Sequence, residues 1–193
     1  DKYATDAPTF VIIFGDKNQV APSAIGNQTE CVTDLYYMSV DNDVFPDIYH
    51  SRMCAETVEQ MENIIAKTLL YERYEFPDTT YLNNVLLVAG WDDYFCDYIG
   101  APSIQYALNY YYNAEHGYNE VNYFLGRPYD NAYASLNTGV SFVNYTAHGY
   151  NEGWGEPNLN NNDIPNMTNL GMPFLAMGNC CQAADWGIST TKA

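Results

Sequence analysis

Four short runs of apolar residues stand out along the chain, at residues 9–14, 85–89, 140–145 and 173–177. Each run is followed by a small or polar residue. A short, nearly continuous apolar run is typical of a strand that is covered on both faces, as in a parallel sheet. We therefore predict four buried strands.

The segments between these runs have helical spacing. Residues 55–74 place Val58, Ile65 and Leu69 on one stripe, with charged residues elsewhere. Residues 101–115 carry a proline in their first turn and are followed by Gly117 as a stop.

Two weaker helices are predicted at residues 129–136 and 163–170, and residues 150–162, rich in Asn, Gly and Glu, are predicted to be a surface loop. Strand and helix alternate along the chain. The pattern therefore predicts an α/β fold, a three-layer sandwich with a mainly parallel sheet.

Residues with catalytic chemistry follow three of the four predicted strands. Asp92 and Asp93 come after the second run, His148-Gly149 after the third, and Cys180-Cys181 after the fourth. In open α/β sheets, functional residues gather beyond the carboxyl ends of the strands. One of the two aspartates, His148 and one cysteine are thus expected to face a single crevice.

Cysteine, histidine and a carboxylate together are the set used in nucleophilic catalysis. The thiolate attacks a carbonyl, the histidine moves the proton, and the carboxylate holds the imidazole. Gly149 has no side chain, so its N–H could approach a developing oxyanion closely.

A structural interpretation competes with this one, because a cysteine at a strand end is often a small buried hydrophobe and a His-Gly pair is often a turn. Two observations weigh against the structural interpretation. His148 and the cysteine pair stand at the ends of successive predicted strands, and small residues precede both. His50 lacks this context, and His116, which precedes Gly117, is expected to cap a helix C-terminus.

The net charge of −17 argues against nucleic acid as a partner, since such a field repels phosphate. It would attract cationic substrates, although solubility outside the cell explains it equally well.

No apolar run reaches the length of about 18 residues that a membrane span needs. The five cysteines are odd in number and include no C-x-x-C pair, which argues against a zinc ribbon or a complete disulfide framework.

Two segments stand out, NYTAHG at residues 144–149 and FLAMGNCC at residues 174–181, with a step of 33 residues from His148 to Cys181. Both segments and this spacing closely resemble those of the gingipains, secreted cysteine endopeptidases of the caspase-like clan. Residues 32–37, 110–113 and 136–142 look most like the lysine-specific member. The resemblance implies a caspase-haemoglobinase-like fold.

Carried over residue by residue, the resemblance makes Cys181 the nucleophile, His148 the general acid and base, and Asp92 the carboxylate that orients it. Asp93 remains the physically similar alternative. The oxyanion hole would consist of the N–H groups of Gly149 and Cys181. Neighbouring side chains at a strand end point in opposite directions, so only one cysteine can serve, and Cys180 would pack behind the sheet.

The resemblance implies cleavage of proteins and peptides after a basic residue, with lysine expected first, in a secreted or cell-surface bacterial enzyme without an organic cofactor. The alternatives are an arginine-specific or relaxed peptidase, or a catalytically silent caspase-like module that only binds. Residues 1–193 would form a single partial catalytic domain, with an N-terminal part of about 1–80 and a catalytic sub-domain of about 81–193. It would be incomplete at its C-terminal side, because the family places further strands and the substrate pocket after the nucleophile.

An acidic cluster lies at Asp41, Asp43 and Asp47. It is not an EF-hand, because Phe45 and Pro46 occupy positions five and six, yet hard oxygen ligands at this density suit calcium. A solvated acidic turn is the simpler alternative. The resemblance implies a calcium site formed by these three carboxylates, the backbone carbonyl of Phe45 and the carboxylate of Asp16, with Asp47 replacing the family's longer glutamate.

Overall fold

A computed structural model describes residues 8–25, 28–41, 43–92, 94–118, 120–124 and 129–182. The chain forms two compact units that divide between Thr68 and Leu69. None of the helices in these described ranges is long and apolar enough to cross a membrane.

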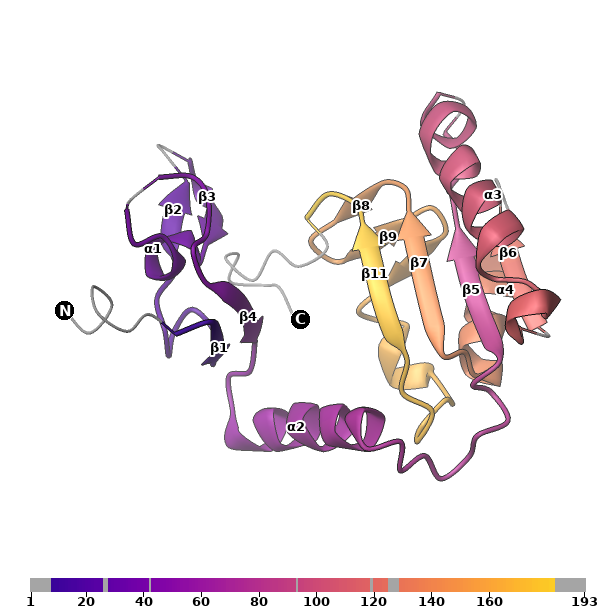
Figure 1. Cartoon of the computed structure of the whole chain (residues 1–193), viewed down its shortest axis with the longest axis horizontal. Helices are drawn as coiled ribbons and strands as arrows, with labels where there is room; N and C mark the ends of the chain where they lie inside the picture. The colour runs from indigo at the N-terminus through magenta and orange to yellow at the C-terminus, as the bar shows by residue number, and fades with distance from the viewer. Residues whose placement is uncertain are drawn as a thin grey trace. The chain divides into compact units, whose positions relative to one another are not determined.

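The second unit contains a four-stranded parallel sheet with the strand order β11-β7-β5-β6 (Figure 1). Its elements are β5 (Asn84–Val88), the π-helical turn η2 (Cys96–Gly100), α3 (Ala101–Tyr110), η3 (Ala114–His116), β6 (Glu120–Phe124), α4 (Tyr129–Thr138), β7 (Phe142–Thr146), β8 (Gly149–Tyr150), β9 (Gly153–Gly155), β10 (Asn158–Asn160), η4 (Ile164–Asn166) and β11 (Leu175–Asn179).

The central strand β5 is covered on both faces. Val85 and Leu87 pack with Ile104 of α3, whereas Leu86 and Val88 pack in a separate cluster with α4. Successive side chains of a strand point to opposite faces, so α3 and α4 lie on opposite sides of the sheet. The predicted three-layer α/β arrangement is confirmed in this unit.

The connections that leave β5 and β7 run in opposite directions. From β5 the chain passes through α3 to β6 on one side, and from β7 it continues to β11 on the other side. β5 and β7 are hydrogen-bonded neighbours. Their carboxyl ends therefore form a topological switch point, the place where open α/β sheets usually hold their functional residues.

The prediction of a loop at residues 150–162 was wrong. This segment contains most of a three-stranded antiparallel sheet with the order β10-β9-β8. Its strands are two or three residues long, too short to show an alternating pattern in the sequence. The helix expected at residues 163–170 is only the 3-10 turn Ile164–Asn166.

The first unit is built from small sheets. Strand β1 pairs with β4 in a parallel ladder, and β2 pairs with β3 in an antiparallel one. Its elements are β1 (Phe10–Phe14), β2 (Ser23–Ile25), β3 (Gln28–Thr33), α1 (Leu35–Met38) and β4 (Tyr49–Met53), and α2 (Val58–Glu72) spans the division between the units.

Burial on both faces was a wrong expectation for the first and last apolar runs. β1 is not part of the four-stranded sheet, and Phe10 is 73% exposed while Ile13 packs with a small cluster. On β11, the outermost strand of this sheet within the described residues, Met177 is 58% exposed. An apolar pattern marks a strand, but the elements that cover it are set by the tertiary structure. The apolar stripe of α2 likewise contains no buried residue.

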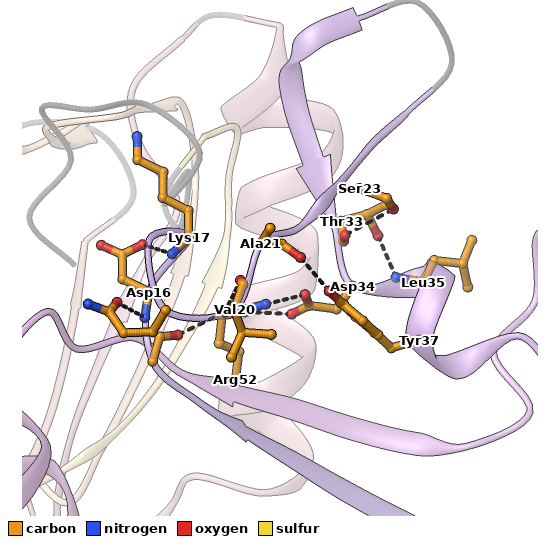
Figure 2. Close-up of polar contacts among 12 residues, drawn as sticks. Asp16, Lys17, Val20, Ala21, Ser23, Thr33, Asp34, Leu35, Tyr37 and Arg52 are labelled. Atoms are coloured by element: carbon orange, nitrogen blue, oxygen red, sulfur yellow. Dashed lines mark hydrogen bonds and ion pairs between the residues drawn. The ribbon is translucent and has the colours of Figure 1, made fainter.

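A buried ion pair organises the first unit (Figure 2). Arg52 on β4 donates through Nε and Nη2 to the two carboxylate oxygens of Asp34, at 2.8 and 2.5 Å. Its Nη1 donates to the carbonyl oxygens of Gly15 and Val20, at 2.8 and 3.1 Å. The two side chains are only 4% and 7% exposed, and the hydrogen bonds to Asp34 raise the pKa of Arg52. This guanidinium therefore joins β4 to the turn after β1 and to the start of α1.

We expect Arg52→Lys to lower the free energy of unfolding of the first unit by about 2 kcal/mol. A lysine keeps the charge but cannot reproduce the planar fork that bonds both carboxylate oxygens and two carbonyls. Urea unfolding measures the effect, with Arg73→Lys on an exposed arginine as the matched control. Equal stability of the two variants would contradict the structural role of Arg52.

Candidate active site

The three catalytic candidates follow three strands that are adjacent in the sheet. Asp92 follows β5, His148 follows β7, and Cys181 follows β11, in the spatial order β11-β7-β5. All three lie beyond the carboxyl ends of parallel strands. The strand order therefore places His148 between the other two, an order that the sequence pattern does not predict, whereas Asp93 lies outside the described residues.

Asp92 and His148 form an ion-pair contact. The distance from Nε2 of His148 to Oδ2 of Asp92 is 3.7 Å, and the side chains are 57% and 40% exposed. This is longer than a catalytic hydrogen bond of about 2.6–3.2 Å, and such contacts are often loose before substrate binds. Within the described residues, Nδ1 of His148 has no hydrogen-bond partner.

The other oxygen of Asp92 caps the turn that leads into η2. Oδ1 accepts hydrogen bonds from the backbone N–H groups of Phe95, at 2.6 Å, and Tyr94, at 3.0 Å. The bond from Phe95 is the main reason why the pKa of Asp92 is lowered, and the nearby His148 acts in the same direction. Asp92 therefore stays charged at neutral pH.

The backbone of His148 is held from two directions. Its carbonyl oxygen accepts the hydroxyl of Tyr145, at 2.5 Å, and the N–H of Gly155, at 2.8 Å. Burial raises the pKa of Tyr145 far above its usual value, so its hydroxyl remains a donor. The imidazole lies beside the ring of Phe95, with ring centroids 5.6 Å apart.

The two neighbouring cysteines have different environments. Cys180 is half-buried and packs against the apolar cluster of β7 and α4, and burial raises the pKa of its thiol. Cys181 is exposed. This is the difference expected from alternating side chains, and it leaves Cys181 as the accessible thiol.

Gly149 lies directly against the cysteine pair. A Cβ atom at this position would be 2.8 Å from the carbonyl oxygen of Cys181 and 3.1 Å from Sγ of Cys180. Such distances leave no room for a side chain. The absence of a side chain therefore allows the backbone after His148 to approach the cysteine loop closely.

The acidic residues at 41–47 bond mainly to their own loop. Oδ2 of Asp47 accepts the N–H of Val40, at 2.7 Å, and Oδ1 of Asp43 accepts the N–H of Phe45, at 2.7 Å. Within the described part of the chain, no three His, Cys, Asp or Glu side chains gather closely enough to hold a metal ion. The donor atoms have the chemistry that calcium prefers, but in this arrangement the carboxylates do not converge on one point.

Two further residues at this site were missed by the sequence analysis. Tyr145 and Glu156 bond to the backbone around His148 and Asp92. Tyr145 lies in an apolar run and in the NYTAHG motif, neither of which indicates that its hydroxyl binds the carbonyl oxygen of His148, and Glu156 lies within the segment that was predicted to be a loop. The glutamate in an Asn- and Gly-rich segment was the single available signal, and it did not reveal a partner more than sixty residues away.

The fold and these strand-end residues define an α/β protein with the constellation of a cysteine peptidase. A model of peptidase family C25 matches residues 1–193, and the chain belongs to this family. Lys-gingipain W83 of Porphyromonas gingivalis is 46% identical over 183 residues, which cover 95% of this chain and 10% of that protein. Gingipain R2 of the same species is 28% identical over 174 residues, which cover 86% of this chain and 23% of that protein.

Solved structures agree with the family assignment. One described as "Structure of Protease" has a TM-score of 0.90 at 45% identity and is matched over 97% of this chain and 41% of its own. The crystal structure of the Arg-specific cysteine proteinase gingipain R has a TM-score of 0.77 at 20% identity, with coverages of 98% and 45%, and supports the fold alone. The caspase-like fold is thus confirmed, and this chain spans about a tenth of the length of the first curated relatives.

Proposed function

We propose that the protein containing this chain is a cysteine endopeptidase that cleaves after a basic residue, with lysine preferred. The observation that carries this proposal is the His148–Asp92 pair next to a cysteine loop whose exposed thiol is Cys181. The identity to Lys-gingipain, 46% against 28% for gingipain R2, favours lysine over arginine. The acidic composition is compatible with cationic substrates and with a secreted or cell-surface enzyme.

In the proposed mechanism, the Cys181 thiolate attacks the carbonyl carbon of the scissile bond. The N–H groups of Gly149 and Cys181 stabilise the resulting oxyanion. His148 then donates a proton to the amide nitrogen as the C–N bond breaks, which releases the amine and leaves a thioester. His148 removes a proton from water, the water oxygen attacks the thioester, and the C–S bond breaks to regenerate the thiolate. Asp92 on the Nε2 side keeps Nδ1 directed at Cys181.

Fluorogenic peptides that differ only in a Lys or Arg before the cleaved bond test this proposal on the full-length protein. A higher kcat/KM for the Lys peptide supports it. A higher value for the Arg peptide would assign arginine specificity. No Cys181-dependent hydrolysis of either peptide would favour a silent binding module.

We also propose that calcium stabilises the first unit through Asp41, Asp43, Asp47, the carbonyl of Phe45 and Asp16. The density of hard oxygen donors supports this, and Asp16 is a buried polar residue of the first unit. Because the carboxylates now bond to backbone N–H groups, binding would require them to turn toward a common point.

Chelation is therefore expected to lower the melting temperature. An ion that binds only the native state stabilises it by roughly 2.7 kcal/mol at a hundredfold excess over Kd. Asp43→Ala should remove most of the calcium dependence, whereas Glu62→Ala on the exposed face of α2 should not. Identical melting curves with calcium and with chelator would identify residues 41–47 as a solvated acidic turn.

A further inference from the structure

Glu156 binds the backbone of the turn that carries Asp92. Its Oε2 accepts the N–H of Trp91, at 2.9 Å, and the N–H of Asp92 itself, at 3.3 Å. These residues are 65 and 64 positions apart from Glu156 in the sequence. Charged acceptors form stronger hydrogen bonds than neutral ones, so one carboxylate oxygen fixes two consecutive peptide groups after β5.

Gly90, the residue before this turn, leaves space for the carboxylate of Glu156. Gly90 has φ of +70°, a conformation that favours glycine. A Cβ atom at residue 90 would lie 2.4 Å from Oε2 of Glu156 and 2.7 Å from Cβ of Ala147. The lack of a side chain at residue 90 is thus required for the carboxylate to reach the two N–H groups.

The backbone of Glu156 is tied to the other catalytic loop. Its N–H donates to the hydroxyl oxygen of Tyr145, at 2.8 Å, and that hydroxyl donates to the carbonyl oxygen of His148. The preceding residue, Gly155, donates to the same carbonyl, at 2.8 Å. The main chain of residues 155–156 therefore holds the His148 loop, while the side chain of Glu156 holds the Asp92 loop.

We infer that Glu156 is a positioning residue for the proposed reaction, because it fixes the backbone of Asp92 relative to that of His148. The inference rests on the proposed peptidase function, in which His148 and Asp92 act as a pair. The carboxylate of Glu156 bonds to peptide N–H groups and acts on the chemistry only through Asp92. This relation makes a specific prediction about combined substitutions.

The test is a double-mutant cycle in the full-length protein. Glu156→Ala should lower kcat about 10-fold to 100-fold with little change in KM, since the turn that carries Asp92 loses its support. Glu156→Gln should restore most of kcat, because its amide oxygen can accept the same N–H groups. The double variant Glu156→Ala/Asp92→Asn should have nearly the same kcat as Asp92→Asn alone, because both substitutions remove the same contribution, that of the correctly placed Asp92 carboxylate.

Glu152→Ala provides the matched control, because Glu152 is an exposed glutamate four residues earlier in the same segment. It should leave kcat unchanged. If Glu156→Ala does not fold, Glu156→Met keeps the length and volume without the acceptor and takes its place in the cycle. The rate of alkylation of Cys181 by iodoacetamide near pH 7 gives a second measurement. This rate should fall in the variants in which kcat falls.

Two results would overturn the inference while leaving the proposed function intact. One is a kcat for Glu156→Ala equal to that of Glu152→Ala. The other is a loss of kcat in the double variant that equals the product of the two single losses, because such independence indicates a general structural effect. An unsubstituted protein without Cys181-dependent hydrolysis would instead overturn the proposed function, and the inference with it.

Discussion

Cys181→Ala is expected to lower kcat by at least about 10⁴-fold, whereas Cys180→Ala should retain most of the activity. The nucleophile cannot be replaced by the remaining groups, because without the thiol no acyl intermediate forms. Cys180 is half-buried against the apolar cluster of the second unit, so its loss removes only a small packing contact. Hydrolysis of a Lys or Arg peptide by the full-length protein measures both effects.

Alkylation distinguishes the same two residues without a substrate. Burial raises the pKa of the Cys54 and Cys180 thiols, so at any given pH a smaller fraction of each is thiolate than for an ordinary thiol. Their labelling should become appreciable only at alkaline pH, above about 8.5. Cys181 should react first at pH 7. A peptide map showing Cys180 as the preferred site at that pH would reverse the assignment.

Asp92→Asn is expected to lower kcat by about 10²-fold or more, and by less than Cys181→Ala, because orientation is one contribution among several. The amide oxygen of asparagine can still accept the N–H groups of Tyr94 and Phe95, so the turn into η2 should be preserved. What is lost is the carboxylate 3.7 Å from Nε2 of His148. Steady-state kinetics on the full-length variant measures the loss.

Asp93→Asn is the control at the neighbouring position and should lower kcat only slightly. The reverse order of the two variants would move the orienting role to Asp93. The pH profile adds a further condition, because hydrogen bonds lower the pKa of Asp92 below the ordinary value of about 4. Asp92 therefore remains ionised as the pH falls toward that value. A loss of activity that occurs at any pH above that value must come from the titration of another group.

Local patterns were sufficient to locate the main elements. The runs at residues 85–89 and 140–145 correspond to β5 and β7 within two residues, and the helix predicted to begin at residue 101 begins there. The reason is that strand and helix periodicities are properties of consecutive residues. The alternation of side chains also predicted that Cys180 and Cys181 would differ in exposure.

The sequence by itself determined which residues follow each strand, and so determined that Asp92, His148 and the cysteine pair could meet at one edge of a sheet. Only the tertiary structure decided that β5 and β7 are neighbours, that β1 belongs to a separate small sheet, and that Glu156 reaches the N–H groups of Trp91 and Asp92. Strand order and such distant contacts depend on how whole elements pack against one another, and no periodicity in the chain encodes them. The same reason explains why most residues of β1 and all residues of β11 are exposed or only partly buried, while four of the five residues of β5 are buried.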